Sequence, residues 1–252
     1  MSEDAAGPGR APRGRLILHV GTHKTGTTSF QESLKVNAPL LARRGVGVVD
    51  EGFTSRTGEA RSRTNLMALS DLFIRPGVAT GYRLRRGQEP AQGLIGGVRS
   101  AWERSAWALR LARRPERDLI LSSEGMCFLR TPQEARRIKR FLAATRRRPL
   151  FLLVTRNPDD WRASWSAQLD GNKRVRQGLA ASDPALRIDA PWYFDLEAIR
   201  AFWGALGELH EIDFDAAMAA EGNIVPGLYR AAGIELAGLD VDVRLNTRAE
   251  KS

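Results

Sequence analysis

A dense run of donor side chains follows the first apolar segment of the chain. The sequence Gly21-Thr-His-Lys-Thr-Gly-Thr-Thr-Ser29 comes directly after Arg15–Val20, whose length and apolar character are typical of a buried strand. Glycines let the backbone turn tightly and approach an anion, and the N–H groups that open the next helix bind anion oxygens. Lys24 adds an ammonium group. This pattern favours a cradle for a nucleotide that carries phosphate or sulfate groups, spanning His19 to Leu34, over an ordinary turn.

The cradle departs from the phosphate-binding loop of nucleotide triphosphatases, which reads Gly-x-x-x-x-Gly-Lys-Ser/Thr. Gly21 and Gly26 have the required separation, but Thr27 stands where the lysine belongs, and Lys24 lies inside the loop. Asp213 is only a weak candidate for holding a magnesium ion. The departure argues against hydrolysis of ATP or GTP.

A second polar group ends another apolar run. The segment Leu152–Arg156 ends in arginine, and Ser164 follows eight positions later on a predicted helix. A forked guanidinium and a hydroxyl near a helix start are chemically suited to bind phosphate.

Together the two motifs resemble those of sulfotransferases that use 3′-phosphoadenylyl sulfate (PAPS). The loop from His23 to Ser29 looks like the family's 5′-phosphosulfate loop, and Arg156 with Ser164 looks like its 3′-phosphate site. Arg248 lies where family members often close a loop over the 3′-phosphate, although this chain lacks the Arg-Lys-Gly of cytosolic members. The resemblance implies that PAPS, and the product 3′,5′-adenosine bisphosphate (PAP), contact Thr22, His23, Lys24, Thr25, Gly26, Thr27, Thr28, Ser29, Arg156, Ser164 and Arg248.

Sulfuryl transfer needs charge neutralisation on the leaving group and a base for the acceptor. Lys24 is expected to stabilise charge on the departing oxygen. Glu124, at the polar end of the predicted strand Asp118–Glu124, is the expected base, because related sulfotransferases place a His or Glu at a comparable strand end. His23 is the competing base, and it is otherwise expected to shape the loop. Trp161 and Trp165 share a helix face and are expected to be core residues, with the acceptor channel as the alternative.

Apolar segments of strand length alternate with helical segments, which predicts an α/β fold. We expect a mostly parallel central sheet flanked by helices, as in P-loop nucleotide-hydrolase-like sulfotransferases, with a disordered leader (1–14) and one domain (15–252). Polar clusters at three strand ends (22–29, 122–124 and 155–157) are expected to form one composite site. Strands are expected at 15–20, 46–49, 118–124, 149–155 and 208–214, and helices at 29–37, 40–44, 65–74, 93–113, 159–168, 191–206 and 222–232.

Local signals fix further expectations. Thr131-Pro-Gln-Glu134 predicts a helix start with a capping box, and Pro39 is expected to end the first helix. The polar segment 52–63 is interpreted as a loop, 75–88 as irregular, and 170–191 as a surface segment or lid. The stripe Leu94, Val98, Trp102, Ala106, Leu109 and Leu111 predicts an apolar helix face whose tryptophan is core.

Composition limits the classes of partner. The net charge of +10 suits an anionic ligand, and the single cysteine, Cys127, excludes an internal disulfide. With three dispersed histidines we expect no metal site. No apolar run approaches the roughly 20 residues of a membrane helix, and the N-terminus has no apolar block, so we expect a cytoplasmic enzyme without a membrane or nucleic-acid partner. The expected acceptor is a small molecule or carbohydrate with a hydroxyl or amine. Two alternatives remain: a P-loop-like nucleotide kinase, and a non-catalytic module that binds anions or nucleic acid.

Overall fold

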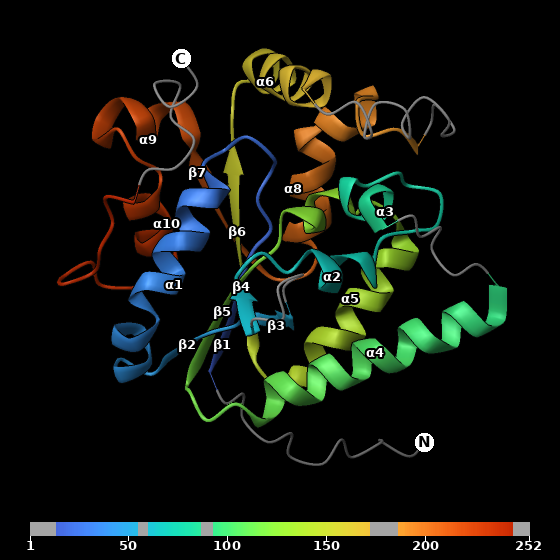
Figure 1. Ribbon diagram of the computed structural model, residues 1–252, viewed down its shortest axis with the longest axis horizontal. Helices are drawn as coiled ribbons and strands as arrows, with labels where there is room; N and C mark the ends of the chain where they lie inside the picture. Colours follow the sequence, from blue (N-terminus) through green and yellow to red (C-terminus); the bar gives the residue numbers. More distant parts are fainter. Residues whose placement is uncertain (1–13, 55–59, 87–92, 172–185, 244–252) are drawn as a thin grey trace, which may run out of the picture.

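A five-stranded parallel sheet lies at the centre of the protein (Figure 1). The computed structural model describes residues 14–54, 60–86, 93–171 and 186–243. Each neighbouring pair of strands in this sheet is parallel, which confirms the predicted α/β fold class. The strands run in the order β2 (Val46–Val48), β5 (Asp118–Ser122), β1 (Arg15–His19), β6 (Arg148–Thr155) and β7 (Glu208–Asp213).

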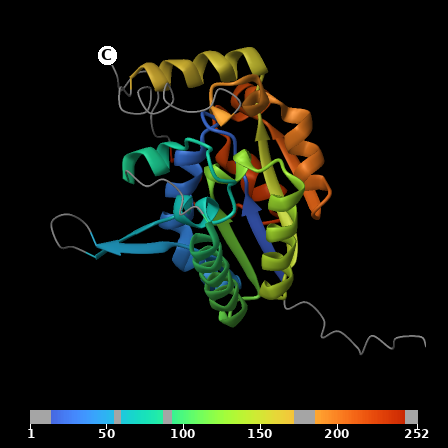
Figure 2. The same cartoon turned by 90° about the vertical axis from the view of Figure 1, so that its right-hand side faces the viewer.

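Helices cover both faces of the sheet (Figures 1 and 2). Helices α1 (Thr27–Arg43) and α10 (Val225–Ala231) pack on the face that carries Ile17 and Leu152. The opposite face carries Leu16 and Leu18. It is covered by α4 (Gly93–Arg113), α5 (Pro132–Thr145), α6 (Pro158–Asp170) and α8 (Leu196–Gly204). Because side chains alternate between the faces of a strand, cover on both sides explains why β1, β5 and β6 are largely apolar.

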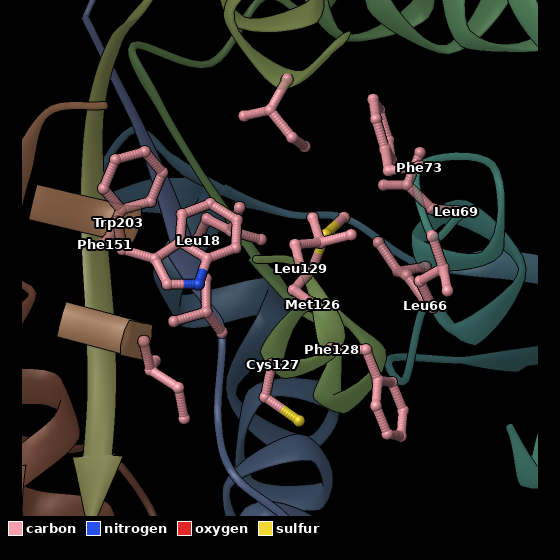
Figure 3. Packing of buried hydrophobic residues seen from close by; sticks show 14 of the residues in the cluster. Leu18, Leu66, Leu69, Phe73, Met126, Cys127, Phe128, Leu129, Phe151 and Trp203 are labelled. Carbon is pink, nitrogen blue, oxygen red and sulfur yellow. The ribbon is translucent and has the colours of Figure 1, made fainter. Parts of the chain in front are cut away.

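A short 3₁₀ helix, η1 (Glu124–Phe128), follows β5 directly and fixes the edge of the larger core. Figure 3 shows Met126 and Leu129 between Leu18 and Leu66, and all four side chains are buried. Helix α2 (Met67–Asp71) packs against η1 and is shorter than the predicted helix 65–74. The chain after β5 is therefore held on both sides by apolar contacts.

Helix α1 continues to Arg43, so the predicted stop at Pro39 is wrong. A proline inside a helix removes one hydrogen bond and crowds the preceding turn, at a cost of about 3 kcal/mol. The last turn places Leu41 fully inside the core, and Arg44 donates to the carbonyl oxygens of Glu235 and Ala237. These tertiary contacts offset the local cost.

The predicted loop 52–63 is also wrong, because its ends pair as an antiparallel hairpin of β3 (Glu51–Thr54) and β4 (Ala60–Arg63). Figure 2 shows the hairpin extending away from the main sheet. Glu51 and Arg63 are opposite each other, and their side chains form an ion pair of 3.9 Å. A hairpin that extends away from the core is held by main-chain pairing and needs no alternation of apolar and polar residues. The sequence pattern therefore did not indicate strands here.

The bounds of α4 were predicted correctly, but its apolar stripe is not a core face. Val98, Trp102 and Leu109 are more than half exposed, at 62%, 71% and 54%. Among the described side chains of the stripe, Leu111 alone is buried, next to the buried Ala108, since the C-terminal half of α4 packs on α5. Helical periodicity identified a stripe without showing that another element covers it.

Other elements differ from expectation mainly at their ends. The predicted helix 191–206 is divided into η3 (Pro191–Phe194) and α8, because Asp195 accepts a hydrogen bond from the Ala198 N–H and caps α8. Helices α3 (Gly81–Arg86) and α9 (Phe214–Glu221) were not predicted. The capping box of Thr131 and Glu134 is present as predicted. Among the described helices, none has the length and apolar character to cross a membrane.

Candidate functional site

The three polar clusters predicted to meet do so at the C-terminal ends of β5, β1 and β6. These ends point upward in Figure 1, beneath α6. The chain leaving β1 stays attached to β6, because the Val20 N–H donates to the Leu152 carbonyl and the Thr22 hydroxyl donates to the Val154 carbonyl, both at 3.0 Å. On the other side, the Ser123 N–H donates to the His19 carbonyl at 3.0 Å. The loop after β1 therefore lies between the two neighbouring strand ends.

The loop has a strained backbone. Lys24 adopts a left-handed conformation with φ of 67°, which is uncommon for a residue other than glycine and is often found at functional sites. Gly26 has φ of 75°, and a Cβ there would lie 2.5 Å from Cγ2 of Ile224. A Cβ on Gly21 would lie 2.6 Å from Nε2 of His19. Gly21 and Gly26 are thus required because the backbone at these two positions packs against the side chains of His19 and Ile224.

Helix α1 begins at this loop without a side-chain cap. Its N-cap is Gly26, which makes no side-chain cap hydrogen bond, and its first turn has no acidic residue. Helices α5, α6, α8 and α9 are capped instead by Thr131, Asn157, Asp195 and Asp213. The start of α1 thus has neither a capping side chain at its N-cap nor an acidic residue, and its N–H groups carry the positive end of the helix dipole, which favours an anion.

The hydroxyl groups of the loop divide into two sets. Thr22 and Thr25 are buried, and Thr25 donates to the Thr22 carbonyl at 2.6 Å, so these hydroxyls hold the loop together. Thr27 and Ser29 are also nearly buried at the start of α1, whereas Thr28 is exposed there. The sequence reasoning assigned all of them to ligand contact and missed the internal role of Thr22 and Thr25.

Arg156 joins the second motif to the first. Its Nη1 donates to the Lys24 carbonyl at 3.2 Å, so the two motifs are in direct contact across 132 positions of sequence. Asp215 on α9 lies 3.7 Å from Nε of Arg156 and also accepts from the Asn157 N–H at 3.0 Å. Ser164 is half-buried on α6. Arg248 lies outside the described residues.

Glu124 stands where the sequence predicted it, directly after β5 and as the first residue of η1. It is half-buried, and Nδ2 of Asn65 donates to its Oε2 at 3.4 Å. The next residue, Gly125, packs so closely on α2 that a Cβ would lie 2.1 Å from Oγ of Ser70. Its neighbours therefore fix the position of the carboxylate.

His19 is a core residue, and so are Trp161 and Trp165, as predicted for these two tryptophans. His19 is fully buried, its Nδ1 lies 2.9 Å from Oγ of Ser122, and burial lowers its pKa to about 3. Trp161 and Trp165 are buried on α6. Asp213, the weak candidate for magnesium, accepts from the Ala216 N–H as the cap of α9.

His23 lies in a buried aromatic group beside the loop. Its ring centroid is 4.5 Å from that of Trp165, and its Nδ1 lies 2.5 Å from the hydroxyl of Tyr193. Sγ of Cys127 is 3.7 Å from the same nitrogen, and burial raises the pKa of this thiol to about 12, so it stays protonated. Tyr193, Asp215 and Asn65 are site residues that the sequence reasoning missed, since their partners lie far away in sequence. In the described part of the chain, no cluster of three His, Cys, Asp or Glu side chains is suited to hold a metal ion.

The protein is similar in structure to a solved sulfotransferase, although its sequence matches no known family. No protein-family model matches the chain, and no curated protein matches it. A sulfotransferase from Alicyclobacillus acidocaldarius is similar in structure, with 15% sequence identity over 96% of this chain and 89% of that chain. The TM-score is 0.49. A likeness at this level does not assign a function, so the interpretation of the site rests on the residues described above.

Proposed function

We propose that this protein is a sulfotransferase that moves a sulfuryl group from PAPS to a hydroxyl or amine of a small-molecule or carbohydrate acceptor. The observation that carries the proposal is the contact of Arg156 with the Lys24 carbonyl, beside the uncapped start of α1. Two cationic side chains and a helix N-terminus suit a ligand with two separate anionic ends. The resemblance of both motifs to those of PAPS-dependent enzymes supports the same assignment.

The residues present fit such a nucleotide. The close contact of Gly26 with Ile224 leaves no room for a side chain at the N-cap of α1. No side chain at this position therefore competes with a bound anion. We assign the 5′-phosphosulfate end to this helix start, with Lys24 and the hydroxyl of Thr28. We assign the 3′-phosphate end to Arg156, with Ser164 and Arg248 as further proposed contacts.

PAPS, when bound, supplies the sulfuryl group, and the chain supplies position and charge. The carboxylate of Glu124 takes the proton of the acceptor hydroxyl as the new O–S bond forms. The ammonium of Lys24 neutralises the negative charge left on the bridging oxygen when the old O–S bond breaks. The proposal includes no metal ion.

The nucleotide assignment is tested by isothermal titration of the protein with PAP in EDTA and, separately, with ATP in magnesium. We expect PAP to bind far more tightly than ATP. Lys24→Ala and Arg156→Ala should each weaken PAP binding about 10- to 100-fold, since a charge-assisted hydrogen bond contributes about 1.5–3 kcal/mol. Lys35→Ala and Arg162→Ala are matched controls on α1 and α6 with exposed side chains and should bind PAP as the unmodified protein does. Equal affinity for ATP, or normal PAP binding by Arg156→Ala, would refute the assignment.

The transfer itself is tested with PAPS labelled in the sulfuryl group and a panel of acceptors, in EDTA. We expect labelled product from the unmodified protein and at least a 100-fold lower rate from Glu124→Gln, because general base catalysis contributes about 10²–10⁴-fold. Transfer of labelled phosphate from ATP in magnesium would favour the nucleotide kinase. Tight PAP binding without transfer to any acceptor would favour the non-catalytic anion-binding module.

A further inference from the structure

The buried contacts of Tyr193 determine which nitrogen of His23 carries a proton. Tyr193 is fully buried in η3, and its hydroxyl lies 2.5 Å from Nδ1 of His23. The thiol of Cys127, which extends from the η1 turn in Figure 3, lies 3.8 Å from that oxygen and is oriented to donate to it.

The tyrosine oxygen is thus placed to accept from the Cys127 thiol and carries one proton to donate. Burial raises the pKa of Tyr193 well above its usual value, so that proton is present at neutral pH. The acceptors among the described contacts of the hydroxyl are Nδ1 of His23 and the sulfur of Cys127, and sulfur is a weak acceptor. A protonated Nδ1 would leave the buried tyrosine proton with the weak acceptor alone, which is costly. The favoured arrangement is a chain in which the hydroxyl donates to Nδ1.

We propose that Tyr193 is a positioning residue that fixes His23 as the tautomer with its proton on Nε2, and that His23 for this reason is not the base of the transfer. A neutral imidazole has one acceptor nitrogen, and here the tyrosine occupies it. His23 then presents only an N–H donor to its surroundings. The base is Glu124, whose contact with Asn65 involves a single oxygen in the described structure.

Tyr193 also holds the loop that carries Lys24. Its hydroxyl contacts the side chain of His23, immediately before the left-handed Lys24. The rings of Trp165 and Phe128 lie 4.5 and 5.5 Å from that of His23 and limit its rotation. The base assignment rests on the proposed sulfotransferase function, whereas the tautomer and the loop contact do not.

The tautomer is measured on the ligand-free protein, labelled with ¹⁵N in histidine, by long-range ¹H–¹⁵N correlation. The chain has three histidines, and His23→Asn identifies the signal of His23. We expect an unprotonated Nδ1 and a protonated Nε2 for His23. His210 is an internal reference for a protonated Nδ1, because its Nδ1 faces the Ala231 carbonyl, which can only accept a hydrogen bond.

Tyr193→Phe should change the His23 signals toward a mixture of tautomers. Tyr229→Phe is the matched control, since Tyr229 is also fully buried with a bonded hydroxyl but lies on α10, against Ser33. A protonated Nδ1 in the unmodified protein, or identical His23 signals in Tyr193→Phe, would overturn the proposed tautomer. Thermal unfolding of both variants shows whether any change reflects lost folding.

The base assignment is tested by the pH profile of kcat/KM. His23→Asn keeps an acceptor near the tyrosine but cannot titrate, so its profile should keep the acidic limb, and Glu124→Gln should lose it. Loss of that limb in His23→Asn alone would overturn the inference. If the NMR result is as expected but no sulfuryl transfer occurs, the tautomer stands and the proposed function fails.

Discussion

At the scale of single residues, His19 is a neutral base enclosed under the loop. Its ring packs edge-on against Phe30, with centroids 5.2 Å apart, and Gly21 lies against its Nε2. Burial lowers its pKa to about 3, whereas an unfolded chain protonates histidine near its ordinary value of about 6.5. The unfolded state therefore binds the extra proton between these two pH values. The stabilising contribution is complete above about pH 6.5 and is lost progressively as the pH falls toward 3.

We predict that His19→Asn flattens the pH dependence of stability. Between pH 7.5 and 5.5 the unmodified protein should lose about 1.4 kcal/mol more unfolding free energy than the variant, since each pH unit below the unfolded pKa costs about 1.4 kcal/mol per group. Urea unfolding at both pH values measures this difference. The variant will be less stable at either pH because it loses the ring packing, so only the difference between the pH values is informative. Equal losses in both proteins would contradict a neutral buried His19.

The sequence singled out those candidate site residues that belong to continuous motifs. Lys24, Glu124 and Arg156 follow apolar strands, and topology brings the ends of those strands together. Tyr193 and Asp215 could not be found in this way, because their contacts join positions 170 and 58 residues apart. Nothing local distinguishes them from other tyrosines and aspartates, and their roles arise only when η3 and α9 pack beside the loop.

At the scale of elements, local chemistry predicted helix starts better than helix ends or exposed strands. The capping box at Thr131 needs only four consecutive residues, so the sequence contains all of its determinants. The continuation past Pro39 depends on the burial of Leu41, and the hairpin of β3 and β4 depends on main-chain pairing. Both features depend on contacts between residues that are far apart in sequence, and neither helix and strand propensity nor hydrophobic periodicity detects such contacts.

The start of α1 requires glycine at its N-cap, and this requirement can be tested by substitution. An alanine at Gly26 would need a left-handed backbone, at about 1–2 kcal/mol, and its Cβ would overlap Ile224. We predict that Gly26→Ala lowers the unfolding free energy by at least about 1–2 kcal/mol and weakens PAP binding. Gly97→Ala is the matched control, because Gly97 lies in the interior of α4 with open space at the Cβ position. That substitution should stabilise the protein by about 0.5–1 kcal/mol and leave PAP binding unchanged. Normal PAP affinity in Gly26→Ala would show that the loop backbone does not contact the nucleotide.

At the scale of the whole molecule, the proposed 3′-phosphate end of the site joins three segments that are distant in sequence: the loop after β1, the end of β6 and the start of α9. Asp215 belongs to the last of these and places a negative charge 3.7 Å from Arg156. It also accepts from the Asn157 N–H at the start of α6. In the proposed function this carboxylate competes with a nucleotide phosphate for the same guanidinium.

Asp215→Asn removes the charge and keeps an oxygen that can accept from the Asn157 N–H. We predict that it tightens PAP binding about 1.4- to fivefold at low salt, since partly exposed ion pairs contribute about 0.2–1 kcal/mol. The gain should shrink as salt rises, because the screening length falls from about 10 Å at 0.1 M to about 3 Å at 1 M. Asp159→Asn is the matched control, since Asp159 lies at the same distance of 3.7 Å from Arg162 on α6. Titration of PAP at both salt concentrations separates the outcomes: equal effects of the two substitutions would mean that only net charge matters and that Arg156 does not bind the phosphate.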